Sequence, residues 1–105
     1  MTIDQFIKRE LPALKLMIEN ELKSEFDSHE FIRHFSRKYE LDYVDFLSNY
    51  KVKPFRTVNS KIATSLSKYA DDLGVKKGNE VFSESIFGLN VPNKNWIKTN
   101  YSNEL

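Results

Sequence analysis

The stretch from Thr57 to Leu73 separates apolar from polar positions more clearly than any other part of the chain. At about 100° per residue, the spacing of a helix, its apolar side chains fall on one face. That face consists of Val58, Ile62, Leu66, Tyr69 and Leu73. The opposite face consists of Thr57, Ser60, Lys61, Thr64, Ser67 and Lys68. The pattern predicts an amphipathic helix that packs one face into a core and presents short hydroxyl side chains and lysines on the other.

The amino-terminal part of the chain predicts a long amphipathic helix from Ile3 to about Ser24, with Thr2 as its N-cap. Its apolar stripe consists of Ile3, Phe6, Ile7, Leu11, Leu14, Met17, Ile18 and Leu22. Pro12 lies on the polar side of this stripe, so it either kinks one helix or stands in the first turn of a second one. Leu16 lies off the stripe. Such a stripe is ordinarily core, and the alternative is a seam for a partner helix.

Two shorter helices are expected in the middle of the chain. Asp27 and Glu30 have the spacing of a capping box and open the first of them. Its inner face consists of Phe31, Ile32, Phe35 and Tyr39. Asp42 is expected to cap the second, whose sequence is DYVDFLSNY. Pro54 disfavours helical geometry at Lys53, so the basic segment KVKPF is expected to link this helix to the one that follows.

Towards the carboxyl end the helical period disappears, and Gly and Asn accumulate. Val81–Phe87 and Asn95–Tyr101 are predicted to form two strands, joined by a loop from Gly88 to Lys94. Trp96 and Phe87 are expected to fill the small core between this hairpin and the helices. The fold class expected from these patterns is mainly α with a small β-hairpin.

The composition is that of one small globular domain. The chain has 105 residues, 40% of them hydrophobic, which suffices for a single small core. There is no run of about 18 apolar residues, and the amino terminus lacks the pattern of a signal peptide. We therefore expect a soluble, cytoplasmic protein.

The sequence contains no signature of catalysis. It has no cysteine, which excludes disulfides, thiolate zinc sites and cysteine nucleophiles. Its three glycines form no phosphate-binding loop, and no Ser, His and Asp grouping has the context of a nucleophile. His29 and His34 are five positions apart and fall on different sides of one helix. The expectation is a non-enzymatic protein without cofactor or metal.

Charge is distributed unevenly, although the net charge is only +1. Residues 1–50 carry seven Lys/Arg and ten Asp/Glu, a net charge of −3, whereas residues 51–105 carry nine and five, a net charge of +4. From Lys51 to Ala70 there are five basic residues and no acidic one. This local excess indicates a polyanionic partner, bound with modest affinity and strong salt dependence. The alternative is a solvated basic surface.

The order helix, short helix, basic turn, helix and hairpin resembles a winged helix-turn-helix domain over residues 27–101. More narrowly, FRTVNSKIATSLSKYADDLGV, followed by SESIFG and NWIK, is similar to winged-helix segments that accompany phage and plasmid primase-helicases. It also resembles small accessory proteins encoded beside polymerase-like primases in replication modules of bacterial mobile genetic elements. On this resemblance, residues 1–26 form an additional amphipathic helix and residues 102–105 a tail.

The resemblance implies a DNA-binding accessory protein of DNA replication, which binds single-stranded rather than duplex DNA and a polymerase or primase. Its expected DNA contacts are Arg56, Thr57, Ser60, Lys61, Thr64, Lys68, Lys76, Lys77, Lys94 and Lys98. Its expected contacts with the protein partner, or with a second copy in a homodimer, are Phe6, Leu16 and Met17.

Two alternatives remain, a protein-interaction module without DNA contact and a transcriptional regulator. The regulator is less favoured, because the exposed face of residues 57–73 lacks the Arg, Asn and Gln side chains that read base edges. Asn59 stands only at the margin of that face.

Overall fold

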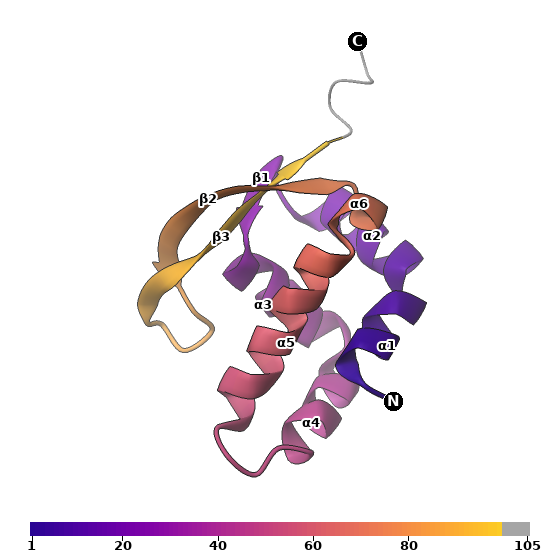
Figure 1. Cartoon of the computed structure of the whole chain (residues 1–105), viewed down its shortest axis with the longest axis vertical. Helices are drawn as coiled ribbons and strands as arrows, with labels where there is room; N and C mark the ends of the chain where they lie inside the picture. Colours follow the sequence, from indigo (N-terminus) through magenta and orange to yellow (C-terminus); the bar gives the residue numbers. More distant parts are fainter. Residues whose placement is uncertain (100–105) are drawn as a thin grey trace.

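The computed structural model describes residues 1–99 and shows a mainly helical chain with a β-hairpin near its carboxyl end (Figure 1). The helices are α1 (Ile3–Arg9), α2 (Leu11–Glu21), α3 (Ser28–Lys38), α4 (Glu40–Ser48), α5 (Pro54–Lys68) and α6 (Ala70–Leu73). The strands are β1 (Glu25–Asp27), β2 (Val75–Glu84) and β3 (Asn90–Lys98). In Figure 1, α5 runs through the middle of the molecule, with α1 on one side and the hairpin on the other. Helices followed by a hairpin are therefore confirmed.

The hairpin belongs to a three-stranded antiparallel sheet with the order β1-β3-β2. Phe26 of β1 pairs with Trp96 of β3, and Val75 of β2 pairs with Lys98. The sequence does not predict β1, because three residues are too few to show the two-residue period of a strand. The last strand of the described chain thus lies at the centre of the sheet.

The hairpin strands begin and end earlier than predicted. β2 starts at Val75 rather than at Val81, and β3 ends at Lys98. Residues 85–89 join the strands, in place of the predicted loop of residues 88–94, and Gly88 takes the left-handed φ of 77° in this turn. The first half of β2 is mostly exposed and polar, so it lacks the alternation that would reveal it. The predicted strand end at Tyr101 lies outside the described residues.

The amino-terminal segment forms two helices instead of one. α1 ends at Arg9 and α2 begins at Leu11, with Pro12 in its first turn, the second of the two positions expected for this proline. Thr2 is the predicted N-cap of α1, and its Oγ1 accepts a hydrogen bond from the backbone N–H of Gln5. The break redirects the chain, so that both halves of the apolar stripe pack onto the same core.

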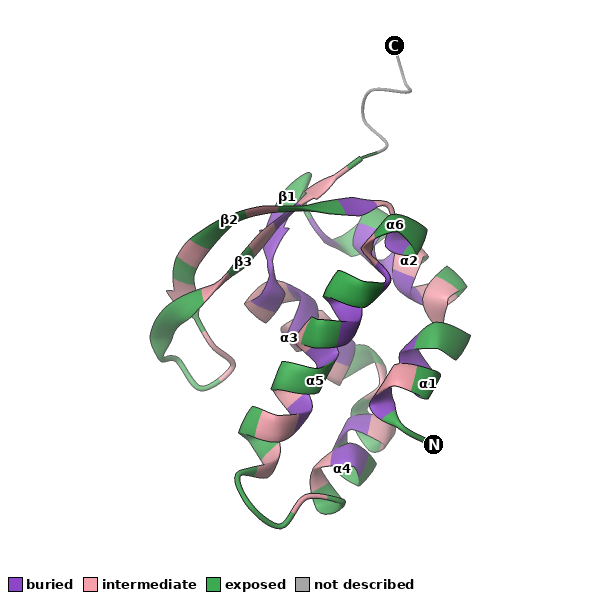
Figure 2. Cartoon of the chain, in the orientation of Figure 1, coloured by how far each residue is buried: buried purple, intermediate pink, exposed green. Residues whose placement is uncertain are grey.

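The predicted apolar face of residues 57–73 lies in the middle of the core, although Tyr69 divides the segment into α5 and α6. Val58, Ile62 and Leu66 are fully buried. Burying each of these side chains contributes about 1.5–3 kcal/mol. Figure 2 shows the buried face of α5 alternating with its exposed face along the helix. The assignment of core and surface on this helix is confirmed.

The two predicted caps of the middle helices have different outcomes. Asp27 and Glu30 form the expected capping box at the start of α3. Asp42 is not a cap, because α4 already begins at Glu40, directly after Tyr39. Asp42 instead lies in the first turn of α4, where a carboxylate still interacts favourably with the helix dipole.

The two aromatic residues expected to fill the core also differ. Trp96 is buried, with 1% of its surface exposed, as predicted. For Phe87 the prediction is wrong, since 55% of its surface is exposed. Phe87 belongs to the turn beyond the end of β2, and its ring makes an edge-to-face contact with Phe55 of α5, with 4.8 Å between the ring centroids.

Candidate nucleic-acid interface

The exposed face of α5 forms one wall of an open groove of about 810 Å³. The groove is lined by Thr2, Ile3, Asp4, Tyr50, Val52, Lys53, Arg56, Thr57, Ser60, Lys61, Thr64, Ser65 and Lys68. All six residues of α5 that were predicted to contact DNA are in this set. The opposite wall comes from the start of α1 and from the connection between α4 and α5. The helical period predicts that the six side chains share a face, whereas the hollow itself arises only from tertiary packing.

The start of α5 is fixed by Lys53 and Pro54. Pro54 stands in the first turn of α5, where its missing N–H leaves no hydrogen bond unmade. Lys53 before it lies outside the right-handed helical region, as predicted, but its φ of 45° and ψ of 58° are left-handed and not the extended values that a following proline favours. The carbonyl of Lys53 accepts a hydrogen bond from the N–H of Thr57 at 3.0 Å. This tight entry into the helix brings Lys53 to the same groove as Arg56.

Lys68 lies beside the start of α1, where its Nζ is 3.1 Å from Oδ1 of Asp4. The hydroxyl of Tyr69 donates a hydrogen bond to the other carboxylate oxygen, at 3.2 Å. The hydrogen bond and the negative charge of Asp4 raise the pKa of Lys68. Lys68 is therefore charged at neutral pH, but its charge is balanced by a neighbour.

The remaining cations of the groove are Lys53, Arg56 and Lys61, which together we call the basic end of the groove. Within residues 1–99 none of the three forms an ion pair. The Nζ of Lys61 lies 5.9 Å from the centroid of the Tyr50 ring, a cation–π contact that leaves the positive charge uncompensated. The positive excess of the groove therefore extends from the start of α5 to its middle.

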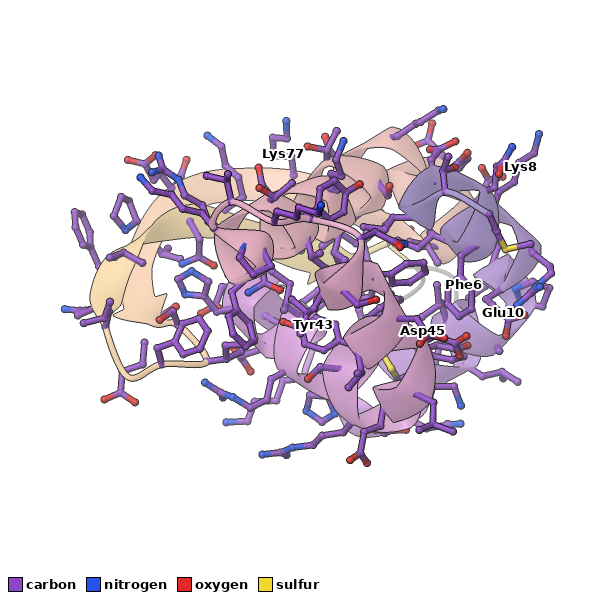
Figure 3. The ribbon with its side chains drawn as sticks, turned by 90° about the horizontal axis from the view of Figure 1, so that it is seen from below. Phe6, Lys8, Glu10, Tyr43, Asp45 and Lys77 are labelled. Atoms are coloured by element: carbon purple, nitrogen blue, oxygen red, sulfur yellow. The ribbon has the colours of Figure 1, made fainter. Side chains whose placement is uncertain are left out.

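The lysines of the hairpin do not gather at one place. Lys76 and Lys77 are exposed on the first part of β2 and do not line the groove. The Nζ of Lys77 lies 6.0 Å from the centroid of the Trp96 ring, and Figure 3 shows Lys77 at the periphery of the molecule. Lys94 of β3 lies elsewhere, beside a second hollow that it shares with Arg56.

Lys98 is not a free surface cation. Its Nζ donates hydrogen bonds to the backbone carbonyls of Leu22 and Glu19, at 2.5 and 3.3 Å. These carbonyls belong to the end of α2, where the last turn of a helix has no backbone donors of its own. Lys98 thus caps α2, so it is a weaker candidate for a DNA contact than the cations that line the groove.

The second hollow has a volume of about 500 Å³ and lies between α3, α5 and the tip of the hairpin; we call it the hairpin cleft. It is lined by Ser28, His29, Ile32, Arg56, Asn59, Ser60, Ala63, Ser85, Ile86, Phe87, Pro92, Asn93 and Lys94. It shares Arg56 and Ser60 with the groove, so the two hollows meet along α5. Sequence reasoning missed the cleft, because the turn and α5 come together only in the folded chain.

Side-chain hydrogen bonds hold the hairpin against the start of α3. The buried Nε1 of Trp96 donates to Oγ of Ser28 at 2.9 Å. The backbone N–H of His29 donates to Oδ1 of Asn93 at 3.1 Å, and Nδ1 of His29 lies 2.9 Å from Oγ of Ser83. These bonds join α3 to both strands of the hairpin, so they fix the back of the hairpin cleft.

Of the three residues predicted to contact a partner, Leu16 alone lies on the surface, with 57% of its area exposed. Phe6 and Met17 are core residues, so for them the prediction is wrong. The ring of Phe6 packs edge-to-face against Phe35 and Phe46, with 6.0 and 5.4 Å between centroids. The turn between α1 and α2 directs their stripe inward, which leaves no open seam at these positions.

The two histidines have separate partners, since Nδ1 of His34 lies 3.0 Å from Oε1 of Glu21 and His29 contacts Ser83. Within residues 1–99, no group of three His, Cys, Asp or Glu side chains could hold a metal ion. Nor does this part of the chain contain a helix long and apolar enough to span a membrane.

No protein-family model, curated protein or solved structure matches the chain significantly.

Proposed function

We propose that the protein is a DNA-binding accessory factor of DNA replication, which binds single-stranded DNA and a polymerase or primase. The observation that carries the proposal is the basic end of the groove, where Lys53, Arg56 and Lys61 form no ion pair within residues 1–99. Unpaired cations along an open groove are what a phosphate backbone requires, because each contact releases condensed counterions. A role in replication implies a cytoplasmic location.

The order of the elements supports a winged helix-turn-helix architecture. On this proposal α4 and α5 form the helix-turn-helix, and β2 with β3 forms the wing. In helix-turn-helix proteins the second helix is the one presented to nucleic acid. Here that helix is α5, which carries the groove cations Arg56 and Lys61.

The small hydroxyl residues of α5 fit backbone contact. Thr57, Ser60 and Thr64 line the groove and leave room for a phosphate to approach the helix. Because this face offers few side chains that read base edges, binding should depend little on sequence. Together with the resemblance described above, this favours a replication accessory factor over a transcriptional regulator.

One observation favours the alternative of a protein-interaction module. The hairpin exposes large apolar side chains, with 69% of Phe82 and 62% of Leu89 accessible. Exposed apolar patches of this kind mark protein contacts when they are continuous. A polymerase or primase partner would accommodate both observations, with the hairpin or Leu16 as its docking point.

The test is a titration of oligonucleotide affinity against salt, measured by fluorescence anisotropy for wild type and for the variant Lys53→Ala/Lys61→Ala. Wild type should bind an oligothymidine strand more tightly than a duplex, and the double variant should bind more weakly. Its slope of log affinity against log salt, between about 50 and 200 mM, should be flatter by about 1.4, or about 0.7 per lost phosphate contact on a single strand.

The matched control is Lys8→Ala/Lys23→Ala, which removes the same charge from exposed positions outside the groove. Its slope should change by less than that of the groove variant. Equal slopes for both double variants would refute a specific role for the groove. Undetectable binding of wild type at low salt would refute DNA binding and leave the protein-interaction module.

A further inference from the structure

The two hollows beside α5 have different chemistry. The groove is lined by cations and hydroxyls, whereas the hairpin cleft has apolar walls. These walls are formed by Ile32, Ala63, Ile86, Phe87 and Pro92. Arg56 and Ser60 line both hollows, so a ligand lying in the groove passes the mouth of the cleft. A polymer in which charged groups alternate with flat apolar groups would fill both hollows, with its charged groups in the groove and a flat group in the cleft.

The exposed ring in the cleft wall is held in place without being covered. Phe87 contacts Phe55 edge-to-face at 4.8 Å between centroids, and still exposes 55% of its surface. Edge-to-face contact restrains a ring and leaves ring surface available for stacking. Aromatic side chains beside a positively charged groove are the arrangement that single-strand binding proteins use, since every base has a flat face that can stack.

The polar groups of the cleft suit the edge of a base. The hydroxyl of Tyr43 donates to Oδ1 of Asn59 at 2.6 Å, and this hydrogen bond fixes the orientation of the amide. The two N–H donors on Nδ2 of Asn59 take no part in this bond, and Asn59 lines the cleft, so these donors can serve a base edge. Lys94 lies on the same lining and Arg56 on the boundary with the groove, so positive charge flanks the apolar walls.

We infer that the hairpin cleft receives one unpaired base of a single-stranded nucleic acid whose phosphates lie along the basic end of the groove. The inference rests on the proposed binding of single strands. A volume of about 500 Å³ is within the range of small-molecule sites, so it accommodates a base with its sugar. A duplex cannot supply this contact, because its bases remain stacked inside the helix. The cleft therefore selects single strands over duplexes.

The experiment is a thermodynamic cycle on the full chain with two variants and two ligands. The ligands are an oligothymidine strand and a strand of equal length and charge that lacks bases. The variants are Phe87→Ala and, as matched control, Phe82→Ala, which removes an exposed phenylalanine of the same hairpin outside both hollows. Thermal unfolding of both variants checks that the fold is kept.

Phe87→Ala should weaken binding of the oligothymidine strand at least about fivefold, the lower bound for loss of one stacked base, and leave binding of the baseless strand unchanged. Phe82→Ala should change neither affinity. If wild type binds both strands equally, or if Phe87→Ala weakens both alike, the cleft does not hold a base, while DNA binding by the groove stands. If Phe87→Ala leaves the affinity for both strands unchanged, the cleft does not hold a base, and a protein partner becomes its candidate occupant. If no strand binds to wild type, both proposals fail together.

Discussion

Replacing Ser28 by alanine should loosen the hairpin at the contact that anchors it to α3. The Oγ of Ser28 accepts the indole N–H of Trp96 at 2.9 Å, and only 5% of Ser28 and 1% of Trp96 are exposed. Without this oxygen the indole N–H is left buried and unpaired. An orphaned buried donor costs about 1–3 kcal/mol, so the melting temperature of a domain of this size should fall by about 4 °C or more.

A double-variant cycle separates the hydrogen bond from packing. Trp96→Phe removes the donor together with part of the ring, so it loses buried area but leaves no N–H unpaired. Adding Ser28→Ala to Trp96→Phe should then cost little, and the double variant should be more stable than the sum of the single effects by about 1 kcal/mol. Urea unfolding followed by circular dichroism measures all three variants.

The control is Ser48→Ala, which removes a hydroxyl that donates to the carbonyl of Asp45 on the exposed surface. Its stability should change by no more than about 0.5 kcal/mol. Additive effects in the cycle, or a Ser28→Ala variant as stable as Ser48→Ala, would mean that the indole N–H finds another acceptor. The anchor between hairpin and α3 would then not depend on this bond.

Three further outcomes follow from individual contacts. Lys98→Met should lower the free energy of unfolding by about 1 kcal/mol, because the carbonyls that end α2 lose their donor. Its affinity for an oligonucleotide should stay unchanged. A drop in affinity at equal stability would contradict the capping role. Burial and the hydrogen bond to Glu10 raise the pKa of Tyr39 above its ordinary value of about 10, so the folded chain holds this proton more tightly than the unfolded chain. This contribution to the free energy of unfolding is complete below about pH 10 and is lost as the pH rises beyond it. Between a pH below about 10 and one above it, the urea midpoint of Tyr39→Phe should therefore fall less than that of wild type. Leu16→Glu should leave the melting temperature nearly unchanged and weaken association with a co-expressed polymerase or primase; an unaltered complex would exclude Leu16 from the docking surface.

The parts of the fold that sequence reasoning predicts are those fixed by local periodicity and capping. Val58, Ile62 and Leu66 recur at helical spacing, so their common burial could be foreseen. The capping box of Asp27 and Glu30 is a local hydrogen-bond pattern and is equally readable. In each case the information lies within a few neighbouring residues.

The parts that escape prediction depend on contacts between distant segments. Phe87 and Phe6 are both phenylalanines, and nothing in their neighbours distinguishes an exposed residue of the turn from a buried one that packs against aromatic rings of α3 and α4. The role of Lys98 depends on the end of α2, more than seventy positions away in the sequence. The hairpin cleft has the same origin, since its walls come from α3, α5 and the turn.

The central place of β3 in the sheet predicts an order of events during folding. Both β1 and β2 pair with β3, and the hydrogen bond between Ser28 and Trp96 joins residues 68 positions apart. Contacts within and between neighbouring helices close short loops and form early, whereas closure of so long a loop is slow. We therefore expect the indole of Trp96 to enter its buried position at this late step. In stopped-flow refolding, the change in tryptophan fluorescence should therefore be slower than the recovery of helical circular dichroism. The fluorescence of Trp96 would then measure the rate at which the sheet is completed.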